Sequence, residues 1–579
     1  MSLSNALQIG RSGILAHQRA IDVTGQNIAN ANTPGHSRLR ARLEAAPDLQ
    51  QGLEFGVGQG VRSAGADRVV DEALGNRLRL AGTDAGGAAV TSELVGQLEG
   101  LQNELSDAGL SSRLTRYFDA WSQLSTGPED PALRGLVVAE GQALSQFFQE
   151  LRGSYAELEA QVEAQLESAV GEADGLLSEI ESINERIARG EGGRGRQREA
   201  AALRDRRDVL VDRLAEFFPL TASEDGSGEL NLHVGSTPLL LDGRSRGLTV
   251  ASREVPDSGG GPPRTERFVA VAADNAPVAA GRGTLGALRG FADGELRRAA
   301  EALDGVAAAL VFETNRRHAA GQGLSPRSSF TATQRVADAD LALNLPDAER
   351  RFDAANGSFQ VFVGDPASGQ RVRTTIAVDL DGLGGNDTTL NTLAASLSAV
   401  DGLVASVSPD GRLTVAADPA VSGGAEVSFG EDSSGVLAAL GVNAFFSGRD
   451  ASDVAVEAAV AADPSRLAVG RDHRPGDNRG ALAVAALADE GSALLGGRSV
   501  QRAWAAGVEA LASATNRAAD AAESAATVRE SLEAQREALS GVNSDEEALA
   551  LLRFQRGYQA SARFLSSVDE LTQELLRLV

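Results

Sequence analysis

The chain contains no cysteine and no lysine among its 579 residues. Without cysteine, a disulfide framework, a thiolate zinc site and a cysteine nucleophile are excluded. Without lysine, arginine supplies every permanently charged basic side chain, and the formal net charge is −26. Because a chain of this charge repels a bare phosphate backbone as a whole, nucleic acid is a poor candidate for its partner.

Long apolar runs are also missing from the sequence. No run of about eighteen apolar residues occurs, so no membrane span is predicted. The stretch MSLSNALQIGRSGILAHQRAI lacks a basic region followed by unbroken apolar residues, so no cleaved secretory signal is predicted. Aromatic residues make up 4% of the chain but hydrophobic residues 42%. Small and aliphatic side chains must therefore form the core, in about three or four domains for this length.

The histidines and serines nominate no catalytic residue. The five histidines are scattered, with no HxxxH pair and no neighbouring carboxylate cluster: His17, His36, His233, His318 and His473. Structural or solvated histidines are the favoured interpretation. No GxSxG pattern marks a nucleophilic serine.

Two glycine-rich stretches match ligand-binding loops in part. Residues 281–286, GRGTLG, fit the GxGxxG pattern of dinucleotide sites, but no second strand follows to close a βαβ unit. Residues 379–387, DLDGLGGND, cluster carboxylates as calcium loops do, but Leu383 stands where the EF-hand pattern needs an oxygen ligand. A tight strand-to-helix turn and a polar loop are favoured, with nucleotide and calcium binding as the alternatives.

A repeat of seven positions predicts a long helix over residues 4–30. An apolar stripe follows this repeat through Leu7, Ile14, Ile21 and Ile28. A column of small residues runs beside it through Ala6, Gly13 and Ala20, and Asn27 continues this column. A polar group in such a column can fix the register between two helices. Because one helix cannot bury its own stripe, the pattern predicts a helical partner.

The C-terminal segment predicts a second helix of this kind. Ser544 and Glu547 are spaced as a capping box at its start. Its heptad positions are Leu551, Phe554, Tyr558, Leu565, Val568 and Leu575. The two terminal helices are therefore expected to pair in a coiled-coil-like seam, and the pattern leaves open whether they pair within one chain or between subunits.

The end of the first helix is predicted to be a hinge formed by Asn32, Thr33, Pro34 and Gly35. Pro34 disfavours helical geometry at Thr33. Pro34 and Gly35 suit the two central positions of a type II turn from Thr33 to His36. The hinge therefore turns the chain from the terminal helix toward the next layer.

The whole pattern predicts an α+β multidomain fold, with the paired terminal helices, a helical-bundle domain and inserted β-rich outer domains. Runs such as ELNLHVGSTPLLLDG and GSFQVFVGD alternate as β-hairpins do. The predicted terminal seam, an inner tube domain, comprises residues 1–33 and 544–579. The mainly helical shell comprises 34–218, 285–327 and 466–543, the small β-rich segment 219–284, and the β-rich outer domain 328–465.

Both ends of the sequence resemble the bacterial flagellar axial protein family of rod, hook and junction subunits. LSNALQIGRSGILAHQRAIDVTGQNIANANTPGHSR is similar to the N-terminal signature of that family, and SGVNSDEEALALLRFQRGYQASARFLSSVDELTQELL to the C-terminal signature of its hook–filament junction subunits. LRDRRDVLVDRLAEFFPL, NRRHAAGQGL and LGVNAFFSGRDASDVAV with PGDNRGALA also resemble junction subunits. One departure is His36, which stands where the family usually has tyrosine.

The resemblance implies a non-enzymatic structural subunit of the flagellum that uses no cofactor. It implies export through the flagellar type III apparatus, helical assembly between hook and filament, and a subunit interface formed by the two apolar stripes. The implied partners are copies of the chain itself, the hook protein, the second junction protein (hook-associated protein 3) and an export chaperone that binds the C-terminal segment. Another axial subunit, a hook or rod protein, is one alternative, and a secreted nucleotide-binding enzyme is a more distant one.

Overall fold

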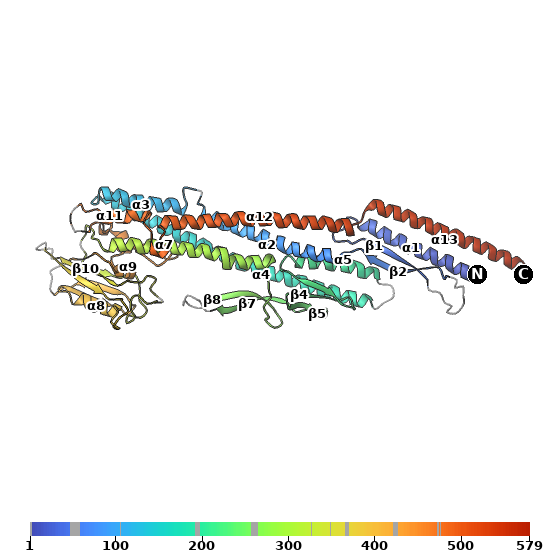
Figure 1. Ribbon diagram of the computed structural model, residues 1–579, viewed down its shortest axis with the longest axis horizontal. Coiled ribbons are helices and arrows are strands. Elements are labelled where there is room, and N and C mark those ends of the chain that lie inside the picture. Colours follow the sequence, from blue (N-terminus) through green and yellow to red (C-terminus); the bar gives the residue numbers. More distant parts are fainter. Residues whose placement is uncertain are drawn as a thin grey trace.

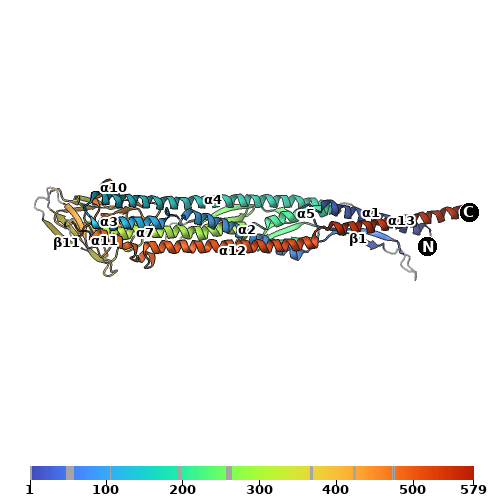
Figure 2. The same ribbon diagram turned by 90° about the horizontal axis from the view of Figure 1, so that it is seen from above.

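Long helices determine the shape of the molecule. The computed structural model describes residues 3–46, 58–104, 106–191, 197–255, 264–325, 327–347, 349–364, 370–420, 426–471, 474 and 476–578. The longest helix, α4 (Pro131–Glu191), has 61 residues, which corresponds to a length of about 90 Å. The chain forms an elongated rod, with both termini at one end and a group of small sheets at the other (Figure 1 and Figure 2).

Amphipathic helices run along the axis of this rod. Leu158, Val162 and Leu166 of α4 recur at helical spacing and are buried, as the core-facing side of a helix requires. The other long helices are α1 (Leu3–Asn30), α2 (Glu72–Gln102), α3 (Leu110–Thr126), α5 (Gln197–Leu214), α7 (Arg297–Ala319), α12 (Val500–Ser540) and α13 (Ser544–Leu578). The shorter ones are α6 (Gly283–Phe291), α8 (Leu390–Ser398), α9 (Val436–Leu440), α10 (Ala458–Ala462) and α11 (Arg479–Ala485). A π-helical turn, Ala292–Leu296, joins α6 to α7, and 3₁₀ turns cover Pro464–Arg466, Ala486–Ala488 and Ala493–Leu495.

The strands form small antiparallel sheets along one side and at the far end of the rod. Near the terminal helices, β1 (Leu39–Ala45) pairs with β2 (Val61–Arg68). Beside α4 lie a sheet of β3 (Thr221–Glu224), β4 (Leu230–Val234), β5 (Thr237–Leu241) and β6 (Arg244–Ser245), and a pair of β7 (Leu248–Val255) and β8 (Arg264–Val271). At the far end lie the sheets β11–β10–β14 and β12–β13–β9 and the pair β15–β16. Their bounds are β9 (Ser329–Thr331), β10 (Gly357–Gly364), β11 (Arg371–Val378), β12 (Leu403–Val407), β13 (Leu413–Ala417), β14 (Glu426–Gly430), β15 (Phe446–Ser447) and β16 (Ala455–Val456).

One contiguous apolar core runs through the helical shell and the sheets of the far end. The few aromatic residues are concentrated in it: the rings of Tyr117, Trp121, Phe445 and Phe446 contact one another, the closest pair with centroids 4.6 Å apart. Among the described residues, none in α1, β1, β2 or α13 belongs to this core. The terminal elements therefore depend on contacts of a different kind.

The structure confirms the α+β multidomain fold with long helices at both termini and several small antiparallel sheets. A short helix, α8, is embedded in the β-rich region. The β1–β2 ribbon contacts α1, although its residues are predicted to begin the shell. The boundaries of the four predicted domains remain a prediction.

His318 in α7 makes the stability of the shell depend on pH. Its ring is fully buried, Nδ1 donates to the carbonyl oxygen of Asn443 (2.8 Å), and Nε2 accepts from the amide of Ala468 (2.9 Å). Burial lowers the pKa of His318 from 6.5 to about 4, so the unfolded state binds the proton more tightly. The stabilising contribution is complete above the unfolded pKa and is lost as the pH falls toward the folded pKa.

We expect the free energy of unfolding of the shell to fall by about 3 kcal/mol over that pH window. His318→Gln, which keeps a donor and an acceptor but cannot titrate, should flatten this part of the profile. Urea denaturation followed by circular dichroism between pH 7 and 4 measures it. An identical pH profile for the variant and the natural chain would contradict the assignment.

Candidate functional site at the paired terminal helices

α1 and α13 pair antiparallel at the end of the rod that holds both termini (Figure 1). Glycines allow the two helices to approach closely. A Cβ atom at Gly10 or Gly13 would lie 2.7 Å from a side-chain atom of α13. A Cβ atom at Gly557 would lie 2.6 Å from the ring of His17. The small column of α1, rather than its apolar stripe, therefore forms the seam.

A buried polar cluster fixes the register of this seam. Asn27 is 1% exposed and Glu547 3% exposed, and the Asn27 amide Nδ2 donates to Glu547 Oε2 (3.0 Å). Asn27 also exchanges two hydrogen bonds with the backbone of Leu39 in β1 (2.8 and 2.9 Å). The guanidinium of Arg38 donates to Glu547 Oε1 (2.8 Å). One carboxylate thus joins α13 to α1 and to the start of β1.

The predicted stripe residues of α1 lie beside the seam, whereas Leu565 of the α13 stripe packs into it opposite Gly10. Val568 alone among the predicted stripe residues is buried, at 5% exposure. Leu7, Ile14, Ile21, Leu551, Phe554 and Leu565 are half-buried, and Ile28, Tyr558 and Leu575 are exposed. Because the stripe and the small column occupy different faces of α1, burying one against α13 leaves the other for a further partner. The role of the ten residues as a subunit interface remains a prediction.

More apolar surface is exposed on the terminal helices than the stripes alone predict. Leu15, Leu549, Leu552, Phe564, Leu571 and Leu576 are between 46% and 73% exposed. Among the described residues, no helix combines the length and the apolar character of a membrane span. Large apolar side chains gathered and exposed in this way are typical of an interaction surface.

The capping box predicted at Ser544 is wrong. The side chain of Asn543 caps α13 instead, because its Oδ1 accepts from the amides of Asp545 (2.9 Å) and Glu546 (3.4 Å). Glu547 is not available for a box, since its carboxylate is held by the partners described above. The contacts of Glu547 with Asn27 and Arg38, which are distant in sequence, thus take the place of the local capping-box hydrogen bond with Ser544.

The turn predicted after the first helix is present between α1 and β1, and the role of Asn32, Thr33, Pro34 and Gly35 as a hinge remains a prediction. α1 ends at Asn30, the amide of His36 donates to the carbonyl oxygen of Thr33 (3.1 Å), and Gly35 has a φ of 78°. A positive φ at this position is what a type II turn requires. A side chain at Gly35 would also collide with Val209 of α5, so the turn is packed against the shell.

The glycine-rich stretch 281–286 packs elements together and leaves no phosphate cradle. The first amides of α6, at Thr284 and Leu285, donate to the carbonyl oxygens of Glu216 and Phe217 (2.9 and 3.1 Å). These are the amides that would hold a phosphate at a helix N-terminus. Gly283 has a φ of 75° and lies against the same backbone, as a tight strand-to-helix turn requires.

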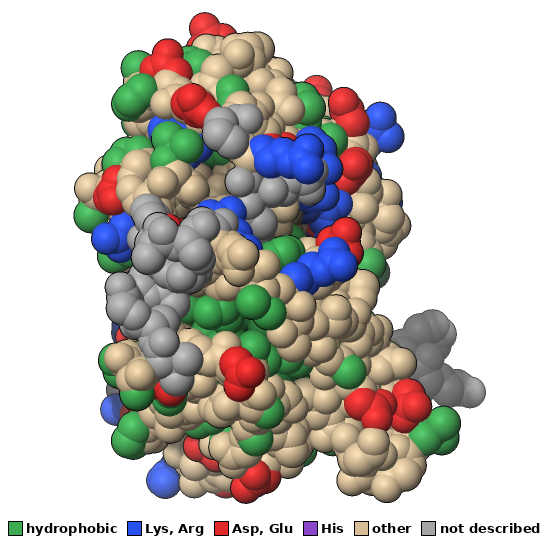
Figure 3. Space-filling model, turned by 90° about the vertical axis from the view of Figure 1, so that its left-hand side faces the viewer, with side chains coloured by type: hydrophobic (Ala, Val, Ile, Leu, Met, Phe, Trp, Pro, Cys, Tyr) green, Lys and Arg blue, Asp and Glu red, His purple; other side chains and the backbone are tan. Residues whose placement is uncertain are grey.

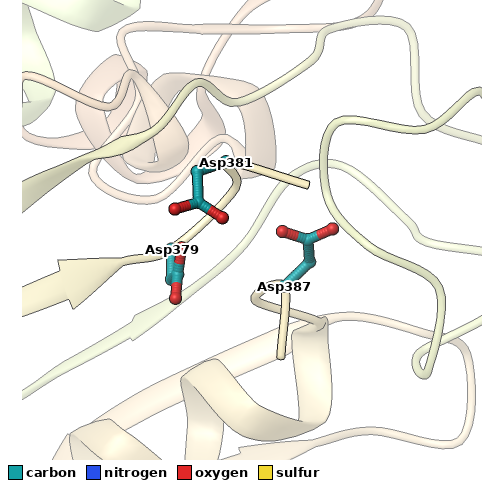
Figure 4. A group of neighbouring side chains, drawn as sticks. All are labelled: Asp379, Asp381 and Asp387. Atoms are coloured by element: carbon teal, nitrogen blue, oxygen red, sulfur yellow. The ribbon is translucent and has the colours of Figure 1, made fainter. Parts of the chain in front are cut away.

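The acidic loop 379–387 brings three carboxylates together in the outer domain (Figure 4). Ligand oxygens of Asp379, Asp381 and Asp387 lie within 4.8 Å of one another. Each of these side chains already accepts a hydrogen bond inside the loop: Asp379 from Asn386, and the other two from backbone amides. These bonds fit the favoured interpretation of a polar loop.

The histidines belong to no group of potential metal ligands in the described part of the chain. His473 lies outside the described residues. The end of the rod opposite to the termini shows Arg and acidic side chains interspersed with small apolar patches (Figure 3). The terminal helices are therefore the strongest candidate for a functional surface.

Glu547→Ala is expected to destabilise the terminal helix pair by about 2–4 kcal/mol, because it leaves the buried amide of Asn27 without this acceptor and removes one of the two carboxylates that bind the partly exposed Arg38. Hydrogen exchange of the α1 and α13 amides measures this local stability. The matched control is Glu546→Ala: Glu546 also binds Arg38 (2.8 Å), but its side chain is 58% exposed, so a change below about 0.5 kcal/mol is expected. Equal effects of the two substitutions would contradict the role of Glu547.

Gly557→Ala is expected to loosen the same helix pair, because the added methyl group would overlap the His17 ring and force one helix away from the other. Gly25→Ala is the control, since no atom lies within 4 Å of a Cβ at that helical position and alanine favours helix there by about 1 kcal/mol. Faster amide exchange in α1 is expected for the first variant and equal or slower exchange for the second. If both variants behave alike, close approach at Gly557 is not what the helix pair needs.

Three family models match separate parts of the chain. The model described as the flagellar hook-associated protein FlgK helical domain matches residues 95–329. The flagella basal body rod protein model matches residues 7–36, and the flagellar basal body rod FlgEFG protein C-terminal model matches residues 535–578. The last two coincide with α1 and its hinge and with α13.

Two characterised relatives that match the chain are both named flagellar hook-associated protein 1. The flagellar hook-associated protein 1 of Escherichia coli (strain K12) is 25% identical over an alignment that covers 100% of both chains. That of Bacillus subtilis (strain 168) is 31% identical over 233 residues, which are 38% of this chain and 44% of that relative. The structure of the flagellar hook junction protein FlgK from Burkholderia pseudomallei is 13% identical and covers 80% of this chain and 100% of that chain, with a TM-score of 0.48.

Proposed function

The chain belongs to the flagellar hook-associated protein 1 family, and we propose on that premise that it is a structural subunit that joins the hook to the filament. It assembles helically with copies of itself through its terminal helices. The role is geometric and requires no catalysis. The observation that carries the proposal is the apolar surface that α1 and α13 leave exposed beside their seam.

The energy for assembly comes from burying this surface. Each large apolar side chain that passes from full exposure to full burial contributes about 1.5–3 kcal/mol. The exposed residues on α13, among them Leu549, Phe564 and Leu571, are left uncovered by α1, so contact with another chain would bury them. Several such contacts together offset the cost of ordering a subunit in an assembly.

The same resemblance supports the finer parts of the proposal. The chain is exported through the flagellar type III apparatus without a cleaved signal peptide, and it resides in the extracellular flagellum. Its neighbours are the hook protein on one side and the second junction protein, hook-associated protein 3, on the other. Before export, a chaperone covers the C-terminal segment, whose exposed leucines need shielding in solution.

We expect Ile21→Asp or Leu565→Asp to block incorporation at the hook tip while the shell stays folded. A carboxylate without a partner in an apolar interface costs several kcal/mol, which lowers the affinity between subunits by about 100-fold or more. Gln18→Asp is the control, because it places the same charge on an exposed position of α1. Immuno-electron microscopy of isolated hook-basal bodies, with circular dichroism for the fold, measures both outcomes.

Two results would overturn parts of this proposal. If the Ile21→Asp and Leu565→Asp chains appear at the hook tip and support filament growth, the stripes are not the subunit interface. If the antibody labels the rod or the full length of the hook, the chain is another axial subunit, and the position at the junction is wrong.

A further inference from the structure

α5 carries three aspartates on one face beside the terminal elements. Asp205, Asp208 and Asp212 are spaced by three and four residues, so they follow one line along the helix. Their side chains are 10%, 35% and 27% exposed, so each is partly withdrawn from water. Carboxylates in such a row repel one another and destabilise the fold unless cations lie between them.

Arginines from three other elements bind this row. Arg68 of β2 contacts both Asp205 (Nε to Oδ1, 2.8 Å) and Asp208. Arg79 of α2 lies between Asp208 (3.7 Å) and Asp212 (2.9 Å). Asp212 also binds Arg536 of α12 (2.8 Å), a third element of the shell. Negative and positive groups thus alternate without interruption along α5, and we call this set of six residues the aspartate ladder.

The hinge that follows α1 is attached to the first member of the ladder. The amide of Ser37 donates to Asp205 Oδ2 (3.2 Å), and His36 Nδ1 lies 3.3 Å from the same oxygen. The ladder therefore connects the terminal unit, which comprises α1, the hinge, β1, β2 and α13, to α2 and α12 of the shell. The terminal unit meets the ladder at Arg68, His36 and Ser37.

Apolar packing between the terminal unit and the shell is slight by comparison. The main core includes no described residue of α1, β1, β2 or α13. Among the described residues, a separate small cluster of Val23, Leu39 and Ala201, with Ala41 and Ala66 packed against it, links the terminal unit to α5, and Gly35 of the hinge packs against Val209. A close-packed core resists displacement because side chains interlock, whereas ion pairs keep most of their energy when partners shift slightly.

We propose that the aspartate ladder is a movable joint on which the terminal unit changes its inclination to the shell. Arg68 lies between two carboxylates of α5, so a small rotation of the terminal unit exchanges its Asp205 pair for its Asp208 pair. Arg79 and Arg536, which belong to the shell, continue to neutralise Asp208 and Asp212 during that motion. The pairs of Asp208 and Asp212 are partly exposed and are screened by salt, whereas the more deeply buried Arg68–Asp205 pair is screened less. Salt therefore loosens the joint without unfolding the helices on either side. This inference concerns the single chain and holds whether or not the chain joins hook and filament.

The absence of cysteine makes the joint directly measurable, since two cysteines can be introduced in the full chain without removing any native one. Spin labels at Gln18 of α1 and Gln535 of α12, both exposed, report the inclination of the terminal unit by double electron–electron resonance. Labels at Gln18 and Gln555 span the α1–α13 pair and report whether the terminal unit itself stays folded.

We expect a narrow Gln18–Gln535 distance distribution at about 0.02 M salt that broadens at least about twofold at about 0.5 M salt, because the Debye length shortens from about 20 Å to about 4 Å and the ion pairs of the ladder weaken. The triple variant Asp205→Asn, Asp208→Asn, Asp212→Asn keeps side-chain shape and should be broad at both salt concentrations. Glu172→Gln with Glu179→Gln is the matched control, since it removes the exposed α4 partners of Arg213 and Arg206 on the same helix α5 and should behave as the natural chain does.

Two results would overturn the joint. One is a narrow Gln18–Gln535 distribution for the triple variant, which would show that packing, not the ladder, sets the inclination. The other is a broad Gln18–Gln555 distribution wherever Gln18–Gln535 is broad, which would show that the terminal unit unfolds rather than rotates.

Discussion

The hydrogen bond between Asn27 and Glu547 joins two residues that are 520 positions apart in the chain. Every element other than α1 and α13 lies between these two residues in sequence. The chain segment that forms the shell and the sheets must therefore begin and end at the same place in the structure. Glycines at the seam bring α1 and α13 close enough for this bond. Because both partners are buried, the bond permits only one register of the two helices. The placement of both termini at one end of the rod follows from it.

The two faces of α1 have different roles in the seam. Small residues pack inward against α13, where a large side chain would separate the helices. Large residues such as Ile14 and Ile21 are displaced to the flank and stay half-buried. A single chain thus satisfies its own register with polar and small groups and leaves its large apolar groups partly uncovered, as the proposed contacts between chains require.

Much of this architecture could be predicted from the sequence, because helix and strand periods are local. The repeat of Leu7, Ile14 and Ile21 predicts the length of α1, and Pro34 with Gly35 predicts the turn that follows it. Periodicity shows which residues share a face but not which neighbour covers that face, so the inward side of α1 could not be assigned. The capping box at Ser544 fails for the same reason, since the partners of Glu547 are far away in sequence. The glycines at 281–286 became interpretable only when the carbonyl partners of the α6 amides were known.

In the assembly proposed above, the flank of half-buried apolar residues would also govern how growth starts. A contact with one neighbour covers only part of this flank and gains little free energy, whereas an existing ring offers several neighbours at once. The gain then grows with the number of neighbours while the loss of translational freedom is incurred only once. Growth from a preformed end is therefore strongly favoured over spontaneous nucleation among free chains. The glycine seam that sets the register inside one chain leaves the large apolar residues on the flank. Assembly through that flank would therefore need an existing end as a template.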